Sequence, residues 1–185
     1  MQHLASRYKD RIQGNEFIVL ENLTLNMTQP NIFDIKIGGR NLEGKTHKIT
    51  KNVSQYCLKL NGCQLNFTSP VFLTKYFLGS VTELASMAQY LALFLSDGHV
   101  LRSSVLAQLI NKLQCLLCVF QEVRGYRFIS SSVCLLYDVC QPQLADLRLI
   151  DFGRAIQESG EFKDDESLVG MQNILKMLQG IQENK

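Results

Sequence analysis

The sequence predicts a single domain of the α+β class. Strand-like runs gather in the first 70 residues, two long stretches with helical periodicity follow, and a pair of strand-like runs and an amphipathic stretch end the chain. Strands and helices that are segregated along the chain in this way are typical of α+β domains. With 185 residues, 46% of them hydrophobic, the chain can bury one substantial core.

The first half contains three predicted strands. Glu16–Glu21 is a short apolar run with polar neighbours, and Asn31–Ile37 is a second run that stops at Gly38. Gly39–Asn52 is polar and rich in lysine, so we expect a loop or a short helix there. Tyr56–Phe67 is the third strand-like run. These strands are expected to form the sheet of the domain.

Helical periodicity dominates the second half. Apolar residues recur at helical spacing in Val81–Leu95 and in Arg102–Val123, and again in the last amphipathic stretch, Ser167–Ile181. Their apolar stripes are expected to face the core. Between them, Tyr126–Tyr137 and Leu147–Asp151 each predict one strand, and together they resemble a hairpin.

The charges are divided unevenly along the chain. The net charge is +2, but residues 1–80 hold ten of the nineteen Lys and Arg residues and five of the seventeen Asp and Glu residues. Such a basic half can attract a polyanion, although a solvated surface would show the same composition.

The sequence carries no sign of secretion or of a membrane span. Met1–Asn15 lacks the apolar core of a signal peptide, and no stretch reaches the ~18 uninterrupted apolar residues that a span needs. The six cysteines lie mostly in apolar runs, which favours reduced thiols. We therefore expect an intracellular protein, cytoplasmic or nuclear. Cys115 and Cys118 form a CxxC pair with no histidine nearby to complete a zinc site, so they are expected to be packing residues.

Two short motifs could carry chemistry. Asp34 and Lys36 lie two residues apart in a predicted strand, so their side chains share one face of it. Asp151 follows the apolar run Leu147–Ile150, which would present a carboxylate at the end of a strand. Oxygen ligands of this kind suit Mg²⁺, and the Asp-Phe-Gly sequence is that of the kinase metal-binding element. Each motif alone is weak.

Together these motifs resemble one family. Pro30–Gly38 matches the PxxxDxKxG signature of the inositol polyphosphate kinases, the family of the inositol hexakisphosphate kinases and inositol polyphosphate multikinases. Arg124–Asp138 resembles especially the block found in the hexakisphosphate kinases. Seven further blocks resemble family segments in the same order: Phe17–Leu23, Asn61–Leu65, Thr74–Phe77, Leu93–Leu101, Arg124–Asp138, Ile150–Arg154 and Ser167–Ile181. Eight ordered blocks are far more specific than any one of them.

The resemblance implies the hinge and C-terminal lobe of a protein-kinase-like, ATP-grasp-related fold. Residues 1–24 would be a remnant of the N-terminal lobe with the hinge, and residues 25–185 would be the C-terminal lobe with the phosphate and metal site. Only sixteen residues precede the hinge strand that starts at Phe17, whereas relatives have a preceding lobe that covers ATP. We therefore expect the chain alone to bind ATP weakly.

The resemblance also implies roles for particular residues. Backbone groups of Glu21 and Leu23 would bind the adenine of ATP, Asp34 would lie near the ribose and the reaction centre, Lys36 would contact the transferred phosphoryl group, and Asp151 would hold Mg²⁺. The partner would be an inositol phosphate and not a nucleic acid. Substrate contacts would come from Lys36, Gln64, Lys75, Arg154, Lys45 and Lys48.

Two other interpretations stay open. Gly39–Thr46 matches the Walker A pattern, and Asp151 could then be its Walker B aspartate, although the polar segment after Thr46 lacks the apolar stripe of a P-loop helix. Alternatively, the chain could be a kinase-like module that binds an inositol phosphate or a protein without turnover.

Overall fold

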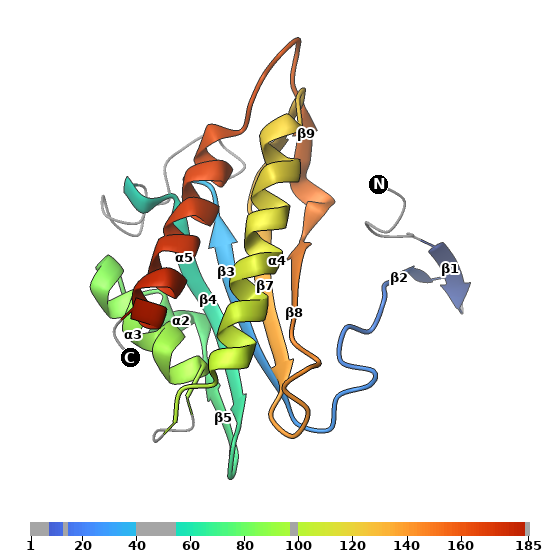
Figure 1. The fold of residues 1–185 in the computed structure, drawn as a ribbon. Coiled ribbons are helices and arrows are strands. Elements are labelled where there is room, and N and C mark those ends of the chain that lie inside the picture. The colour runs from blue at the N-terminus through green and yellow to red at the C-terminus, as the bar shows by residue number, and fades with distance from the viewer. Residues whose placement is uncertain (1–7, 13–14, 40–54, 97–99, 184–185) are drawn as a thin grey trace.

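A five-stranded antiparallel sheet forms the centre of the molecule (Figure 1). The computed structural model describes residues 8–12, 15–39, 55–96 and 100–183, with side chains from residue 19 onward. In the sheet, the order of the strands is β5-β4-β3-β7-β8, and every neighbouring pair is antiparallel. The strands are β3 (Pro30–Ile37), β4 (Leu58–Asn66), β5 (Pro70–Leu73), β7 (Ser132–Asp138) and β8 (Asp146–Ile150).

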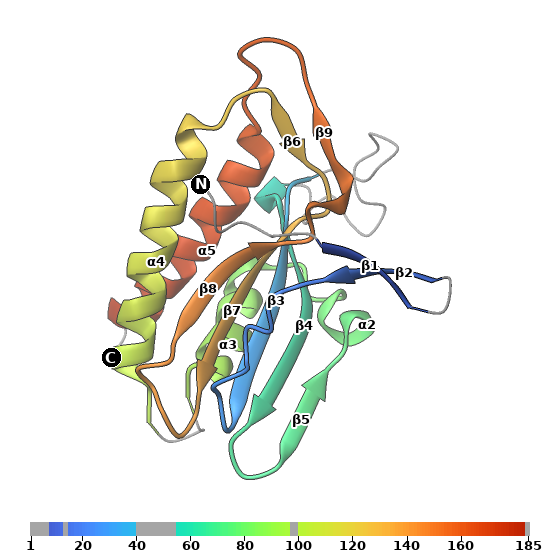
Figure 2. The same cartoon turned by 90° about the vertical axis from the view of Figure 1, so that its right-hand side faces the viewer.

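Two small sheets flank the central one. A hairpin of β1 (Tyr8–Ile12) and β2 (Asn15–Val19) lies on the side of the sheet opposite to α4 and α5 (Figure 2). The strands β6 (Tyr126–Phe128) and β9 (Ala155–Gln157) pair with each other at the end of the molecule where α5 begins.

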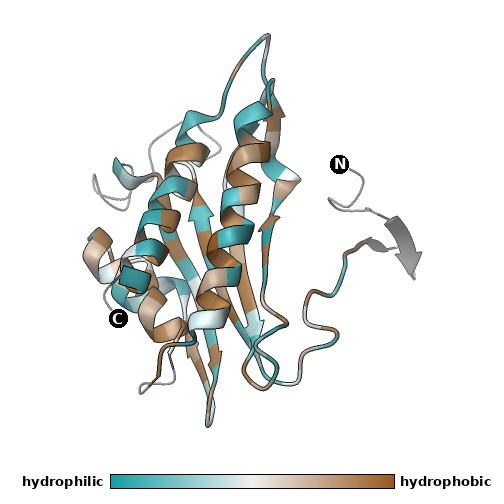
Figure 3. Ribbon diagram, viewed as in Figure 1, coloured by the Kyte–Doolittle hydropathy of each residue, from teal (hydrophilic) through white to brown (hydrophobic). Residues whose placement is uncertain are grey.

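The longer helices cover one face of the sheet (Figure 1). Helix α5 packs against β3, β4 and the two other long helices, while α4 also contacts β8. Both α4 and α5 carry apolar and polar residues in alternation (Figure 3), as amphipathic helices do. The helices are α2 (Lys75–Leu78), α3 (Leu84–Phe94), α4 (Ser103–Glu122) and α5 (Asp165–Glu183).

The core lies between these helices and the sheet. Along β3, Phe33, Ile35 and Ile37 are at most 1% exposed, while the residues between them are only half-buried. The Phe94 ring lies 5.5 Å from that of Phe33 and 5.1 Å from that of Tyr137, measured between centroids. Alternation along the strand therefore buries one face and leaves the other for polar residues.

Helix α5 approaches the sheet closely at Gly170. A Cβ atom added at this glycine would lie 2.2 Å from the carbonyl oxygen of Cys57, just before β4. No larger residue fits there without a shift of the backbone, so Gly170 sets the distance between α5 and the sheet.

Most predicted elements are confirmed. The predicted strands correspond to β2, β3, β4, β7 and β8, the predicted helices to α3, α4 and α5, and β7 and β8 are adjacent antiparallel neighbours. Two predictions are corrected. Tyr126–Tyr137 is not one strand, because Ser130, with φ 59°, breaks it into β6 and β7. The sequence also missed β1, β5, β9 and α2. Cys115 and Cys118 are exposed on α4 instead of packing in the core.

Helix α4 is long and apolar enough to cross a bilayer, judged by length and composition alone. Its residues Leu106, Leu109 and Leu113 are fully buried against the rest of the domain. Core helices commonly share this composition, and here the apolar side of α4 is used in the core.

Candidate functional site

The candidate site lies on the face of the sheet that α4 and α5 leave uncovered. Asp34 and Lys36 both point to this face, because they alternate with the buried Phe33, Ile35 and Ile37. This confirms that the two side chains share one side of the strand. Lys59 of β4 is the register partner of Lys36, and Gly62 is that of Asp34.

Lys36 connects β3 to the end of β8. Its Nζ atom lies 3.4 Å from Oδ2 of Asp151 and donates to the carbonyl oxygen of Ser130 at 3.0 Å and to Oγ of Ser132 at 3.3 Å. The Ser131 hydroxyl donates to the backbone carbonyl of Asp151 at 3.2 Å. The three serines thus support the two charged residues directly, and the structure brings Lys36 and Asp151 together.

Asp151 sits in a sharp turn between β8 and the short 3-10 helix Phe152–Arg154. Its backbone has φ 68°, in the left-handed region that few non-glycine residues adopt. Its side chain remains 57% exposed despite the contact with Lys36. A carboxylate held in this turn is available to a ligand.

Cys134 is a buried thiol beside Asp34 in the sheet. Burial, followed by the fields of Asp34, Asp146 and Asp151, raises the pKa of Cys134 to about 12. Because Cys134 pairs with Asp34 in the sheet, its thiol senses the negative charge that gathers on this face. Cys134 therefore stays a thiol and has no nucleophilic role at neutral pH.

The two oxygens of Asp34 have different surroundings. Oδ2 accepts a hydrogen bond from Nδ2 of Asn61 on β4. Oδ1 is buried and has no hydrogen-bond partner within the described residues. A buried acceptor without a partner is costly, so this atom is a natural attachment point for a ligand donor.

Three lysines lie near enough to one another for their charges to interact. Burial, followed by repulsion from Lys36 and Lys75, lowers the pKa of Lys59. Lys36 comes from β3, Lys59 from β4 and Lys75 from the start of α2, so three separate elements bring their charges together. This lysine cluster suits a ligand with several negative charges. We missed Lys59, although it is the one lysine in the predicted strand Tyr56–Phe67.

The segment predicted to be the hinge, Phe17–Leu23, is tied to the sheet at Glu21. The Glu21 carboxylate lies 3.8 Å from the Arg148 guanidinium, which in turn contacts Asp146 at 2.7 Å. Within the hinge, Oδ1 of Asn22 accepts hydrogen bonds from the backbone and the hydroxyl of Thr24. Leu23, half-buried, lies between them. The hinge is therefore held near β8, whose last residue adjoins Asp151.

Asp138 anchors the connection from the hinge to β3. Its buried carboxylate accepts hydrogen bonds from the backbone N–H groups of Thr28, Gln29, Cys140 and Gln141. Burial alone would raise the pKa of Asp138, but these four donors lower it below its ordinary value. The carboxylate thus fixes where β3 begins.

The other predicted residues are placed less tightly. Gln64 is half-buried on the uncovered face, opposite Ile32. Lys75 is exposed, with its Nζ atom 5.3 Å from the centre of the Tyr76 ring. Arg154 is exposed and close in sequence to Asp151. Lys45 and Lys48 lie outside the described residues, and so does most of the Walker A match.

The sheet argues against the P-loop interpretation. A P-loop follows a strand of a parallel sheet and leads into a crossover helix. Here β3, the strand before the Walker A match, pairs antiparallel with both β4 and β7, and β8 pairs antiparallel with β7. The Walker A match is therefore in the wrong structural context.

Comparison with known proteins identifies the family. Residues 17–179 match the family described as inositol polyphosphate kinase. The chain belongs to this family. It is 29% identical over its whole length to inositol hexakisphosphate kinase 3 of Mus musculus and 27% identical to that of Homo sapiens, of which it covers 55% and 56%. The chain thus spans just over half the length of these curated relatives.

Solved structures agree with the fold. The inositol phosphate multikinase Ipk2 from S. cerevisiae, in complex with ADP and Mn²⁺, matches with a TM-score of 0.82 and 18% identity. The match covers 96% of this chain and 88% of that one. A second inositol phosphate multikinase structure matches with a TM-score of 0.75 and 18% identity, covering 89% of this chain and 85% of that one. The predicted resemblance to the kinase fold of this family is confirmed.

The described residues fit a metal ion that takes most of its coordination from water and substrate phosphates and little from the protein. They contain no group of three or more His, Cys, Asp or Glu side chains that could hold a metal by themselves. Asp151 offers one exposed carboxylate. Magnesium commonly binds through one or two carboxylates and completes its coordination with water and substrate phosphates. The donor set therefore suits a metal that enters together with a nucleotide.

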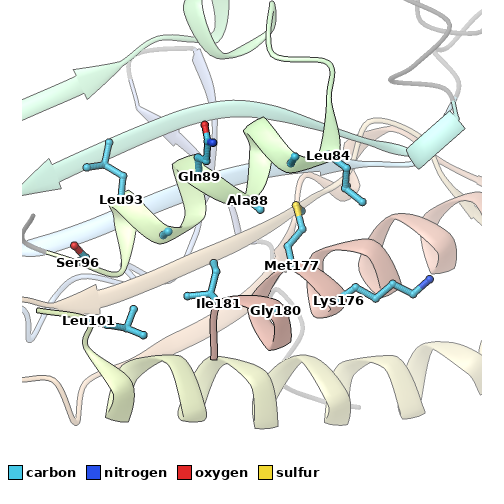
Figure 4. A pocket seen from close by; sticks show the side chains of 12 residues that line it. Leu84, Ala88, Gln89, Leu93, Ser96, Leu101, Lys176, Met177, Gly180 and Ile181 are labelled. Carbon is cyan, nitrogen blue, oxygen red and sulfur yellow. The ribbon is translucent and has the colours of Figure 1, made fainter. Parts of the chain in front are cut away.

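A separate groove lies on the opposite side of the sheet. It has a volume of about 830 Å³ between α3 and α5, and Leu84, Ala88, Met177 and Ile181 contribute to its lining (Figure 4). The lining carries Lys176 as its one charged side chain. This apolar groove has none of the groups that the chemistry of the family needs.

Proposed function

We propose that this chain transfers the γ-phosphoryl group of ATP to a phosphorylated inositol, with a divalent metal held at Asp151. The observation that supports this most is that Lys36 and Lys59 are register partners on the face of the sheet that carries Asp34, with Lys36 3.4 Å from Asp151 and the charge of Lys75 near enough to lower the pKa of Lys59. A polyanionic acceptor needs cations, while a metal needs a carboxylate, and both are present side by side. The relatives named inositol hexakisphosphate kinase support this substrate class.

The residues divide the work between binding and reaction. Hinge groups at Glu21 and Leu23 would position the adenine, and Asp34 would hold a sugar hydroxyl through its unpaired oxygen. Lys59 and Lys75 would bind acceptor phosphates, with Gln64 and Arg154 at the edges of the site. Lys36 would stabilise the negative charge of the transferred group, because it is fixed by Ser130 and Ser132.

Asp151 would hold the metal, for which we propose Mg²⁺. When bound, such a metal shields the charges of the nucleotide phosphates. The protein then contributes mainly position and charge, because phosphoryl transfer needs aligned groups more than a covalent intermediate. This agrees with a site that contains fixed cations and carboxylates and a thiol, Cys134, that stays protonated.

The test is a transfer assay on the purified chain. Labelled ATP, Mg²⁺ and a panel of inositol phosphates are incubated with the protein, and the products are separated by chromatography. Inositol hexakisphosphate is the first acceptor to try, followed by less phosphorylated inositols. We expect a labelled product that disappears in Asp151→Asn.

The same assay separates the alternatives. If the folded chain binds an inositol phosphate and ATP·Mg²⁺ but forms no product with any acceptor, it is a binding module and the proposed activity is wrong. Transfer to water or protein but to no inositol would contradict the substrate class. We also propose an intracellular location, in the cytoplasm or nucleus, in agreement with six cysteines that form no disulfide bond. Fluorescence microscopy of the tagged chain would test it.

A further inference from the structure

Asn61 lies on β4 at an irregular point of its pairing with β3, the strand that carries Asp34 and Lys36. The pairing of β3 with β4 shifts between Asp34 and Ile35: Asp34 faces Gly62, whereas Ile35 faces Leu60. Asn61 lies between these two and has no partner in the register, which is the arrangement of a β-bulge. Bulges next to functional sites commonly redirect a side chain, and this one directs Asn61 toward Asp34.

The redirected side chain makes one contact that matters. Nδ2 of Asn61 donates a hydrogen bond to Oδ2 of Asp34. The other oxygen of the same carboxylate, Oδ1, is buried and has no partner within the described residues. Asn61 therefore fixes one oxygen of Asp34 and leaves the second one free for a ligand.

We propose that Asn61 is a positioning residue, which orients Asp34 so that Oδ1 accepts a hydrogen bond from a hydroxyl group of the bound substrate. This inference rests on the proposed function. The hydroxyl could belong to the sugar of the nucleotide or to the ring of an inositol phosphate that keeps a free hydroxyl group, since both offer the same donor. In either case Asn61 acts through Asp34 and does not contact the reacting atoms.

The contact itself can be tested without any ligand. In NMR spectra of the ¹⁵N-labelled chain, one proton of the Asn61 side-chain amide should be shifted by its charged acceptor and protected from exchange. Asp34→Ala should move this signal to the position of a free amide. An Asn61 signal that is the same in the wild type and in Asp34→Ala would overturn the proposal.

The consequence for ligands is tested by calorimetry with ADP·Mg²⁺ and with inositol 1,4,5-trisphosphate. One of the two ligands should present its hydroxyl to Asp34, and Asn61→Leu should raise the Kd of that ligand about tenfold. This is the loss of affinity expected when a charge-assisted hydrogen bond is removed. Asn66 offers a matched control, because it lies on the same strand and its side chain donates to the carbonyl of Pro30 instead. Asn66→Leu should leave both affinities within about twofold, as expected of a site without ligand contact.

A double-mutant cycle shows whether Asn61 acts through Asp34. In the Asp34→Ala background, Asn61→Leu should no longer change the affinity. An equal loss in both backgrounds would show a general structural role and would overturn the proposal. Asn61→Asp, of nearly the same shape, should weaken binding at least as much, and serves if the leucine variant does not fold.

The outcomes separate this inference from the proposed function. If the wild-type chain binds ADP or the trisphosphate and Asn61→Leu binds equally well, only the role of Asn61 is wrong. If the wild-type chain binds neither ligand, the ligand step of this inference is wrong, whatever the NMR spectra show for the contact with Asp34. The proposed function is then decided by the transfer assay with the whole panel of inositol phosphates.

Discussion

Replacing Lys36 by methionine should nearly abolish phosphoryl transfer while leaving the domain folded. The Nζ atom of Lys36 lies 3.4 Å from Oδ2 of Asp151 and close to two oxygen atoms of the serine segment. Methionine keeps the apolar stem of the side chain but removes the charge. The variant therefore isolates the role of the ammonium group.

The magnitudes can be worked out from these contacts. Two unit charges 3.4 Å apart attract each other by about 5 kcal/mol at an effective dielectric constant of about 20. Because the Asp151 side chain is 57% exposed, solvent reduces the net value of the pair to about 1 kcal/mol. This is small against a total stability of about 5–15 kcal/mol, so the variant should fold. A fixed cation beside a transferred phosphoryl group, in contrast, should be worth about 10²–10³-fold in kcat.

The assay measures kcat and KM for the acceptor under saturating ATP, with thermal unfolding as the check on folding. Lys36→Met should lower kcat, whereas Lys45→Met, in the Walker A match, should mainly raise KM, because the loss of a uniform substrate contact weakens binding. A dead Lys45→Met at saturating acceptor, together with a nearly normal and folded Lys36→Met, would refute the reasoning in favour of the P-loop.

Three more predictions follow from the charges and thiols of the structure. Lys59→Met should raise KM for the acceptor about tenfold and yet raise the melting temperature, because burial and the repulsion from Lys36 and Lys75 disfavour the charged form in the folded state; a lower melting temperature would contradict this. Folding lowers the pKa of Asp138, so the ionised carboxylate stabilises the fold at pH values above its ordinary pKa of about 3.9. This stabilisation is lost as the pH falls below that value. The melting temperature of Asp138→Asn should therefore depend less on pH in this range than that of the wild type. Iodoacetamide at neutral pH should modify the exposed thiols of Cys115, Cys118 and Cys140, as read by mass spectrometry. It should spare Cys63 and Cys134, because burial raises the pKa of each thiol to about 12. The reverse pattern would show that these thiols of β4 and β7 are not buried.

The sequence predicted well those parts in which one strong local pattern decides the structure. Apolar and polar residues alternate from Phe33 to Ile37, so the strand and the common face of Asp34 and Lys36 followed directly. The three long helices followed from their periodicity in the same way. Asp151 was recognised because an apolar strand precedes it and because other family blocks stand in order around it.

The missed parts depend on partners that are distant along the chain. β5 has four residues and β9 has three, and each exists because it pairs with another strand: β5 with β4, and β9 with β6. A run so short carries too little periodicity to be recognised. The role of Lys59 was equally hidden, because it depends on the register with Lys36 and on the approach of Lys75 from α2. The exposure of Cys115 depends on which side of α4 faces the sheet.

The left-handed backbone of Asp151 sets a limit on how this protein can be stabilised. A residue with a Cβ atom in this conformation costs about 1 kcal/mol or more, and glycine avoids the cost. Selection for heat resistance alone would therefore favour Asp151→Gly and would remove the carboxylate on which the proposed metal site depends. Stability and catalysis compete at this single position, as they often do where function requires a strained backbone. Variants chosen by melting temperature should accordingly be screened for loss of transfer before the change is accepted.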